Sequence, residues 1–533
     1  KSAITADLKN RSSVRQTIAE ANVTGTLIDL PAGPVGIALG AAYRETFYDF
    51  VNDTLTTQNA SFLDQAIGIY PSIDFEAEIT VHELYGEMLI PLLADIPAIQ
   101  SLNLEIGGRL SDFSTTGTSY TYKILGDWEV TDWLRFRGGY NRAERAPNIA
   151  ELFLTPQQTF AFNNIGDICS LNSTYFVSAN PAAPGNSATQ AADIQAVCRA
   201  VMNNTGGAGT AEAYYARPLN QQPAAGGGFS FPTIFGNANL QPEIADTFTA
   251  GVVISSPSTA PWLSRLRLSV DWYKIKIENA IGVSPAATVQ RCFDPFYNSL
   301  VSGAAGNAAQ AVAAATSSNC AGNITAVTYD PAPGLGLGRI TATYTNEGVA
   351  DISGIDAQLD WAVDLGPGTV SLNLVGNYYL HYRVKELANN PLVDYVGTFG
   401  TTALGLQLGA FEYRILGNLG YRLGGASLSL QWQHLPSVED SGEAQAPTPN
   451  TTANPNSYDL FNLFGSYALN DALTLRFGVE NLFDRAPPLT NVNTNFDNTG
   501  ATPGVPTLRG GGFNANFYDV SGRRFFLGAN VRF

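Results

Sequence analysis

The chain has 533 residues, a formal net charge of −17 and a pI of about 4.6, so it lacks the overall basic charge that nucleic-acid binding needs. Charged residues make up 14%, below the roughly 25% of a typical soluble domain, and 52 residues are glycine. The sequence has no run of about 18 apolar residues, so no transmembrane helix is expected. Strands of a membrane barrel need only about 10 alternating residues each and are not excluded.

From residue 11 onward, the sequence consists of long segments in which apolar and polar residues alternate. Short connections and mostly long connections join these segments in alternation. The short connections are 29–34, 95–97, 131–132, 256–261, 366–368, 424–425 and 470–471. A large antiparallel membrane barrel predicts this alternation, with short periplasmic turns and long external loops. A β-sandwich predicts turn signals every roughly 8–12 residues, and a β-propeller predicts a repeat of about 40–50 residues, which is absent.

Two of the long connections, residues 146–241 and 282–344, contain all four cysteines. Each should also carry a short helix, at 187–202 with Ser187 as N-cap and at 304–316. Three disulfide pairings are possible. The sequential one, Cys169–Cys198 and Cys292–Cys320, keeps each bridge within one loop and is our prediction; it implies an oxidising compartment. A metal site is disfavoured, because no C-x-x-C occurs and the three histidines are scattered.

The strands expected after residue 266 have one apolar and one polar face. In 473–480 the apolar residues are Leu473, Leu475, Phe477 and Val479, and the alternating ones are Thr474, Arg476, Gly478 and Glu480. An arginine facing lipid at mid-depth costs roughly 2–4 kcal/mol, so the polar face should line a wet lumen. In 266–281 the alternation slips between Trp272 and Ile275, which predicts a bulge. Aromatic girdles are expected at Tyr43, Trp128, Trp133, Trp262 and Trp361.

Four stretches, in this order, resemble TonB-dependent outer-membrane receptors. Residues 137–153 (RGGYNRAERAPNIAELF) resemble the family's mid-barrel signature, including Arg145, Pro147 and Glu151. Residues 236–252 (GNANLQPEIADTFTAGV) resemble the segment that opens its next strand. Residues 478–488 (GVENLFDRAPP) resemble its N-L-F-D strand with Asn481, and residues 522–533 (GRRFFLGANVRF) its last strand with the terminal Phe533.

The resemblance implies an all-β fold, a transmembrane antiparallel barrel of about 22 strands with long extracellular loops that carry short helices. About 15 strands are expected here, and bacterial barrels of this kind close on an even number. We therefore expect 1–533 to be the C-terminal portion of the barrel. The plug, the TonB box and about seven strands should form a missing or separate piece of the receptor.

The resemblance also implies active import through the outer membrane of a Gram-negative bacterium, with energy from TonB, ExbB and ExbD. The outer-membrane assembly machinery would recognise the terminal phenylalanine. Whether a surface lipoprotein also binds the receptor is left open. No cofactor, metal or nucleic acid is implied. A structural or adhesive barrel that presents surface loops is the alternative function, and a soluble secreted β-rich enzyme is a third, weaker one.

No catalytic constellation is recognisable, and Arg145 and Glu151 are expected to form a salt bridge at the base of the first long loop. Aromatic and amide side chains of that loop are the candidate ligand contacts. They are Phe160, Phe162, Asn163, Asn164, Tyr175, Tyr214, Tyr215, Phe229, Phe231 and Phe235. They suit a bulky polar nutrient such as a siderophore, a glycan, cobalamin or another chelate, or else they pack the loop on itself.

Overall fold

The computed structural model describes residues 7–53, 73–158, 161–163, 169–171, 188–218, 228–230, 233–295, 297–321, 341–388, 390–401, 407–441, 455–488 and 517–532. Its main feature is a 16-stranded antiparallel sheet, in which β16 branches from β15 and the other strands follow one another in chain order. The strands are β1 (Arg11–Leu30), β2 (Gly33–Val51), β3 (Phe75–Ile96), β4 (Ile99–Phe113), β5 (Gly117–Thr131), β6 (Leu134–Arg145), β11 (Glu243–Ser255), β12 (Leu266–Gly282), β14 (Thr345–Leu365), β15 (Gly368–Lys385), β16 (Val393–Asp394), β19 (Tyr413–Leu423), β20 (Ala426–Leu435), β22 (Tyr458–Ala468), β23 (Leu473–Glu480) and β24 (Arg524–Val531).

Smaller elements lie in the long connections. The helices are α1 (Ile149–Phe153), α2 (Ala188–Gly206), α3 (Thr210–Tyr215), α4 (Pro285–Phe293), α5 (Ala308–Thr316) and the 3₁₀ turns η3 (Ser299–Val301) and η4 (Ala304–Gly306). The short strands are β7 (Gln157–Gln158), β8 (Ala161–Asn163), β9 (Gly228–Ser230), β10 (Thr233–Phe235), β13 (Thr341–Thr343), β17 (Thr398–Thr401), β18 (Gln407–Ala410) and β21 (Glu439–Asp440). No described helix is long and apolar enough to cross a membrane.

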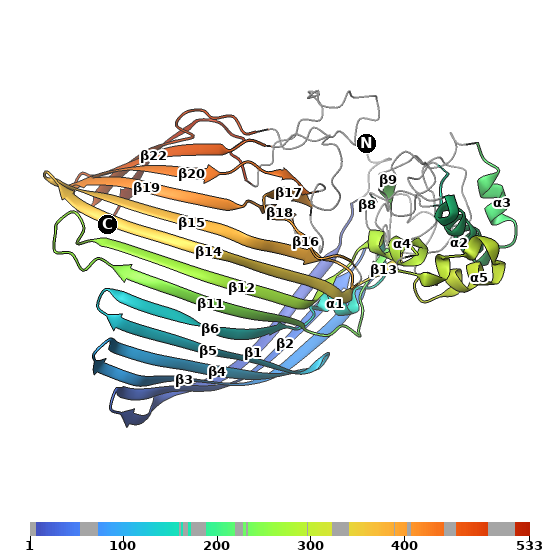
Figure 1. Cartoon of the computed structure of the whole chain (residues 1–533), viewed down its shortest axis with the longest axis horizontal. Helices are drawn as coiled ribbons and strands as arrows, with labels where there is room; N and C mark the ends of the chain where they lie inside the picture. Colours follow the sequence, from blue (N-terminus) through green and yellow to red (C-terminus); the bar gives the residue numbers. More distant parts are fainter. Residues whose placement is uncertain are drawn as a thin grey trace.

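The sheet is long and curved, with tight turns at one end, here called the turn end (Figure 1). The opposite end, the loop end, carries the long connections and the helices α2 to α5. The exposed residues Trp128, Trp133 and Trp262 lie at the turn end, where an aromatic girdle was expected: Trp128 near the end of β5, and Trp133 and Trp262 in the connections that follow β5 and β11. The strand bounds confirm the predicted alternation of short connections with mostly long ones, as in the two residues between β1 and β2 and the long segment between β2 and β3.

Each face of the sheet keeps its chemistry from strand to strand. Leu430 on β20 pairs with Leu419 on β19 and with Leu463 on β22, which makes a row on the apolar face. On the last strand, Phe525 and Leu527 are 74% and 79% exposed. Packed soluble proteins do not leave such a continuous apolar face open to water, whereas lipid covers it in a membrane barrel.

The polar face carries ladders of hydrogen bonds between neighbouring strands. The Asn462 amide donates to Gln431 Oε1 (3.0 Å), and the Gln431 amide donates to Asn418 Oδ1 (3.4 Å). Arg524 Nε on β24 donates to Glu480 Oε2 on β23 at 2.7 Å. Arg476 and Glu480 lie on this face, as predicted, and in a barrel it lines the lumen.

The predicted bulge in β12 is wrong. The strand pairs with β11 without interruption from Arg267 to Glu278, and its register with β14 shifts only beyond Ile277. The apparent slip arises because Lys274 and Lys276 continue on the face that carries Trp272. Strands in this protein extend past the apolar band, and there the outward face becomes charged.

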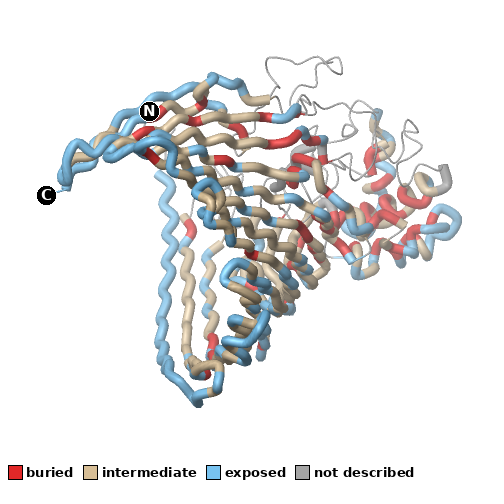
Figure 2. Tube along the Cα trace, turned by 60° about the vertical axis from the view of Figure 1, so that its left-hand side comes forward, coloured by how far each residue is buried: buried red, intermediate tan, exposed pale blue. Residues whose placement is uncertain are grey.

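Both ends of the strand order are open within the described residues. The last strand, β24, pairs with β23 as predicted, and β1 pairs with β2, but β24 and β1 do not pair with each other. Nearly all of β1 is exposed on both faces (Figure 2). An open edge exposes unpaired backbone groups, which are costly in hydrocarbon.

Candidate functional site

A helical module formed by the two cysteine-bearing loops lies at the loop end of the sheet. Both predicted disulfides, Cys169–Cys198 and Cys292–Cys320, are present. Their four cysteines belong to one buried cluster with residues of α2, α4 and α5, so the two loops share a single core. The sequence predicted two separate stapled loops and gave no sign of their union. The helices α3 and α4 were also missed, and the predicted N-cap Ser187 lies outside the described residues.

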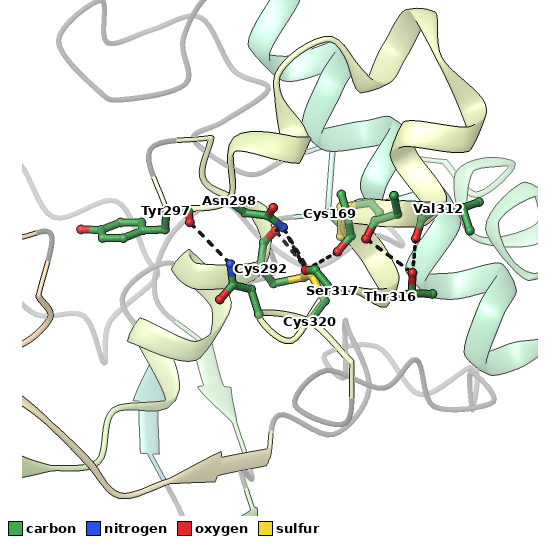
Figure 3. Close-up of a disulfide and its surroundings, with 12 residues drawn as sticks. Cys169, Cys292, Tyr297, Asn298, Val312, Thr316, Ser317 and Cys320 are labelled. Atoms are coloured by element: carbon green, nitrogen blue, oxygen red, sulfur yellow. Dashed lines mark hydrogen bonds between the residues drawn. A yellow bond between two sulfur atoms is a disulfide. The ribbon is translucent and has the colours of Figure 1, made fainter.

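Buried polar groups join the halves of this module. The carboxylate of Asp193 on α2 accepts the backbone N–H groups of Gly303 and Ala305, each at 2.8 Å. Beside the second disulfide, the Asn298 amide donates to the carbonyl of Cys292 (3.0 Å) and to Ser317 Oγ (3.4 Å) (Figure 3). Each of these groups satisfies a backbone donor or acceptor that burial would otherwise leave without a partner.

Arg145, the last residue of β6, fastens the base of the first loop. Its guanidinium donates two hydrogen bonds to Glu151 (2.9 and 3.0 Å) and a third to Glu243 Oε2 on β11 (2.5 Å). Glu151 also completes a capping box with Asn148, which explains why α1 begins there. Glu243 Oε1 accepts the N–H of Ile281, which extends the network to β12. The predicted Arg145–Glu151 salt bridge is confirmed.

Asparagines continue this fastening to the second loop. The N–H of Asn237 donates to the Glu151 carbonyl (2.8 Å) and its amide to the Tyr344 carbonyl (2.9 Å). Asn346 Oδ1 accepts the Gln241 N–H, and its amide donates to the Gln241 carbonyl. Burial raises the pKa of Tyr344, and the charge of Glu151 adds to this. The two motifs at residues 137–153 and 236–252 thus supply the residues that hold the base of the first loop.

The other motif residues are also structural in character. Pro147 is buried, and Asn481 is 1% exposed with a positive φ of 51°. The Asn481 side chain accepts the Arg485 N–H (2.7 Å) and donates to the Arg485 carbonyl (3.0 Å), while its own N–H donates to Asn462 Oδ1. An asparagine tolerates this left-handed conformation better than most residues. Phe533 lies outside the described residues.

An apolar pocket of about 550 Å³ lies between the loop ends of β2 and β3 and the helix α1. Tyr48 and Phe50 of β2 and Phe75 of β3 line one side, and Ile149 and Leu154 line the other. Tyr48 and Phe50 are an even number of residues from Arg44 on β2, so their side chains lie on the same polar face. The pocket therefore opens on the luminal side. The sequence did not single out any of these side chains, because their alternation is that of ordinary strand residues.

The predicted ligand contacts are dispersed. Tyr214 is 4% exposed in the module core, and the Tyr215 hydroxyl donates to the Cys169 carbonyl (3.1 Å). Phe235 is half-buried in β10. Phe162, Asn163 and Phe229 lie on the paired strands β8 and β9, and Phe160, Asn164, Tyr175 and Phe231 lie outside the described residues. Tyr214 thus packs the loop on itself, and ligand contact by the others stays a prediction.

The lumen-facing side of β2 to β12 carries alternating charges. Buried Glu83 meets Arg109 and Arg44, and Arg137 on β6 binds Asp271 on β12 through two hydrogen bonds of 2.6 and 2.7 Å. No group of three or more His, Cys, Asp or Glu side chains able to hold a metal occurs in the described part of the chain. Such paired charges suit a polar lining.

Comparisons with known proteins agree with this architecture. The model of the family "TonB dependent receptor-like, beta-barrel" matches residues 4–482. A mutant of the ferric enterobactin receptor PfeA from Pseudomonas aeruginosa has 15% identity and a TM-score of 0.54, over 98% of this chain and 54% of its own. The siderophore receptor PirA from Acinetobacter baumannii has 14% identity and a TM-score of 0.51, over 98% and 55%. The outer membrane transporter YddB from Escherichia coli has 9% identity and a TM-score of 0.52, over 98% of this chain and 55% of its own.

These similarities to solved structures concern the fold, since the identities are low. The chain spans about half the length of those receptors. A comparison with curated proteins finds no match. The family match covers most of the sequence, and the structure has the strand order, the faces and the loop base that the motifs indicate. The chain belongs to the TonB-dependent receptor β-barrel family.

Proposed function

We propose that this chain, 1–533, forms the C-terminal part of an outer-membrane receptor that imports a bulky nutrient with energy from TonB, ExbB and ExbD. The observation that carries the proposal is the separation of faces in one long antiparallel sheet. An exposed apolar face suits lipid, and a face of ion pairs and amide ladders suits a hydrated passage. The family match supports the same function.

The proposal requires partners for the open edges. Further strands of the same receptor would pair with β1 and β24 and close the barrel, and a plug would fill the lumen between them. The assembly machinery would insert the barrel, and a surface lipoprotein could contact the two loops, 146–241 and 282–344. Covalent chemistry is not part of the proposal, because transport is coupled to conformational change.

The apolar pocket favours a ligand with aromatic or apolar surface. Its lining of Tyr48, Phe50 and Phe75 offers ring faces, and its volume of about 550 Å³ falls in the range of roughly 300–1,000 Å³ for small-molecule sites. The names of the similar structures include a ferric enterobactin receptor and siderophore receptors. An iron chelate is therefore our first candidate nutrient, ahead of a glycan or cobalamin.

The test measures uptake of candidate nutrients by a strain from which the receptor gene is deleted, with and without a plasmid that expresses the full receptor. Expression should restore uptake of one radiolabelled chelate, and a proton uncoupler should abolish it. Tyr48→Ala with Phe75→Ala should reduce uptake, whereas Tyr467→Ala, a control on the apolar face of β22, should not. Surface expression without energy-dependent uptake of any candidate would instead support the structural or adhesive alternative.

A further inference from the structure

A second, polar cavity of about 230 Å³ lies where the module meets the loop ends of β14 and β15, and it shares no lining residue with the luminal pocket. Thr288 and Arg291 of α4 form one wall, and Thr343 and Glu347 form another. Tyr297, Ser318, Asn319 and Leu387 complete the lining. Four separate stretches of the chain therefore meet here, beside the Cys292–Cys320 disulfide. The cavity is smaller than the roughly 300–1,000 Å³ of drug-sized sites, so it suits one small ring rather than a whole chelate.

The charge of the cavity selects against ions. Arg291 Nη2 donates to Glu347 Oε1 at 2.8 Å, so the cation and the anion of the lining neutralise each other. Glu347 Oε2 also accepts the N–H of Ala388 (3.2 Å), which fixes the carboxylate in place. A phosphate or a metal cation would have to break this pair. A neutral ligand would not.

The remaining lining suits hydroxyl groups. Thr343 and Ser318 contribute hydroxyls. The Thr343 hydroxyl donates to the Gly236 carbonyl (3.3 Å) and the Asn319 amide donates to the Tyr297 carbonyl (3.5 Å), so both side chains keep an oxygen as an acceptor. The ring of Tyr297 and the side chain of Leu387 supply apolar surface. The Tyr297 hydroxyl donates to Asn390 Oδ1, which leaves its oxygen as an acceptor. Vicinal hydroxyls with an apolar ring face are the features of a pyranose.

We propose that this cavity binds a single neutral sugar unit at the outer surface of the receptor. The sugar is either a free monosaccharide or the terminal residue of a glycan, since both present the same ring. The site is separate from the pocket between β2, β3 and α1 and does not depend on transport. A receptor that failed every uptake assay would still be expected to bind sugar here.

The test uses the full receptor in a detergent without a sugar headgroup. Saturation-transfer NMR titrations would probe glucose, galactose, mannose and N-acetylglucosamine, and then the methyl glycoside and a disaccharide of any sugar that binds. The expected result is binding of at least one sugar with a millimolar Kd. Retained binding of the glycoside and disaccharide identifies a terminal residue as ligand, and its loss identifies the free sugar; both outcomes support the site.

Variants locate the binding. Ser318→Trp should fill the cavity and abolish binding, and Asn319→Ala should weaken it about tenfold through a lost hydrogen bond. Ala313→Trp, on the exposed side of α5, is the matched control and should bind as the parent does. Non-reducing peptide mapping would verify both disulfides in every variant. Absence of binding for all four sugars, unchanged binding in Ser318→Trp, or tighter binding of serine or inorganic phosphate would overturn the proposal.

Discussion

Two glycines explain how charges of non-adjacent strands meet across the strand between them. Gly251 on β11 pairs with Arg137 on one side and Asp271 on the other, and the ion pair spans it. A β-carbon at Gly251 would lie 2.0 Å from Asp271 Oδ1. Gly107 likewise lies between Glu87 and Lys123, which form an ion pair. The absent side chain makes room for the contact.

Gly251→Ala should therefore displace the Asp271 carboxylate and weaken its contact with Arg137. Because Arg137 is half-exposed, solvent screens the pair, and we expect a loss of only about 1 kcal/mol of unfolding free energy. The matched control is Gly126→Ala, where the nearest atom to the new methyl group is 3.9 Å away. Urea unfolding of the refolded receptor would compare the two. Equal stability of both variants would contradict this account.

Tyr518 gives a prediction about alkaline stability. It is 2% exposed, packs against Tyr458 and Phe411, and its hydroxyl has no hydrogen-bond partner within the described residues. Burial raises its pKa to about 12, whereas the unfolded chain titrates near about 10. Below pH about 10 both states are protonated, so this contribution to stability is complete, and it falls as pH rises towards about 12.

Tyr518→Phe should remove that alkaline loss. It should also raise stability at neutral pH by up to about 1 kcal/mol, because a buried hydroxyl without a partner carries a desolvation cost. Unfolding free energies measured from pH 7 to 12 for parent and variant would show the two curves diverging above pH about 10. A variant less stable than the parent at neutral pH would indicate that the hydroxyl is bonded.

At the scale of elements, the helical module joins two loops through residues that lie 110 and 112 positions apart in sequence. The contact between α2 and the segment of η3 and η4 rests on Asp193, whose carboxylate is buried and receives two backbone N–H groups. Each disulfide holds its own loop, whereas Asp193 holds the loops to each other. We expect the coupling between the loops to depend on this residue.

Asp193→Ala should loosen the module without unfolding the sheet. Hydrogen bonds to a charged acceptor contribute roughly 1.5–3 kcal/mol each, so the amides of Gly303 and Ala305 should exchange with deuterium at least tenfold faster. Asp193→Asn, which keeps one acceptor oxygen, should give an intermediate rate. Glu212→Ala removes an exposed partner of Arg199 and serves as the control. Unchanged exchange at both amides in Asp193→Ala would refute the coupling.

The elements differ in how far the sequence specified them. Strand alternation, connection length and cysteine spacing are local signals, and they predicted the sheet order, the loop base at Arg145 and both disulfides. The union of the two loops and the pocket at Tyr48 were not predictable, because they depend on which strands curve towards each other. The break in alternation between Trp272 and Ile275 led to the wrong prediction of a bulge for a related reason. The periodicity of a sequence does not show where a strand leaves the apolar band.

At the scale of the whole molecule, the strand faces imply two different solvents. The row through Leu430 joins apolar residues of three neighbouring strands, and the row through Gln431 joins amides of the same strands. A one-residue step along β20 therefore moves a side chain from lipid to lumen. A soluble sheet packed on a second layer would also bury one face, so the solvent on the apolar side has to be tested directly.

Leu430→Arg and Ser429→Arg separate these cases at adjacent positions of β20. In a lipid bilayer, an arginine at Leu430 should cost about 2–4 kcal/mol of folding free energy, whereas one at Ser429 should cost less than about 1 kcal/mol because the lumen is hydrated. Equilibrium refolding of the full receptor into phospholipid vesicles would measure both. Equal costs would mean that the two faces meet the same solvent, and the barrel assignment would fail. A larger cost at Leu430 places the apolar face of the entire sheet in hydrocarbon, because the strand register connects it from β1 to β24.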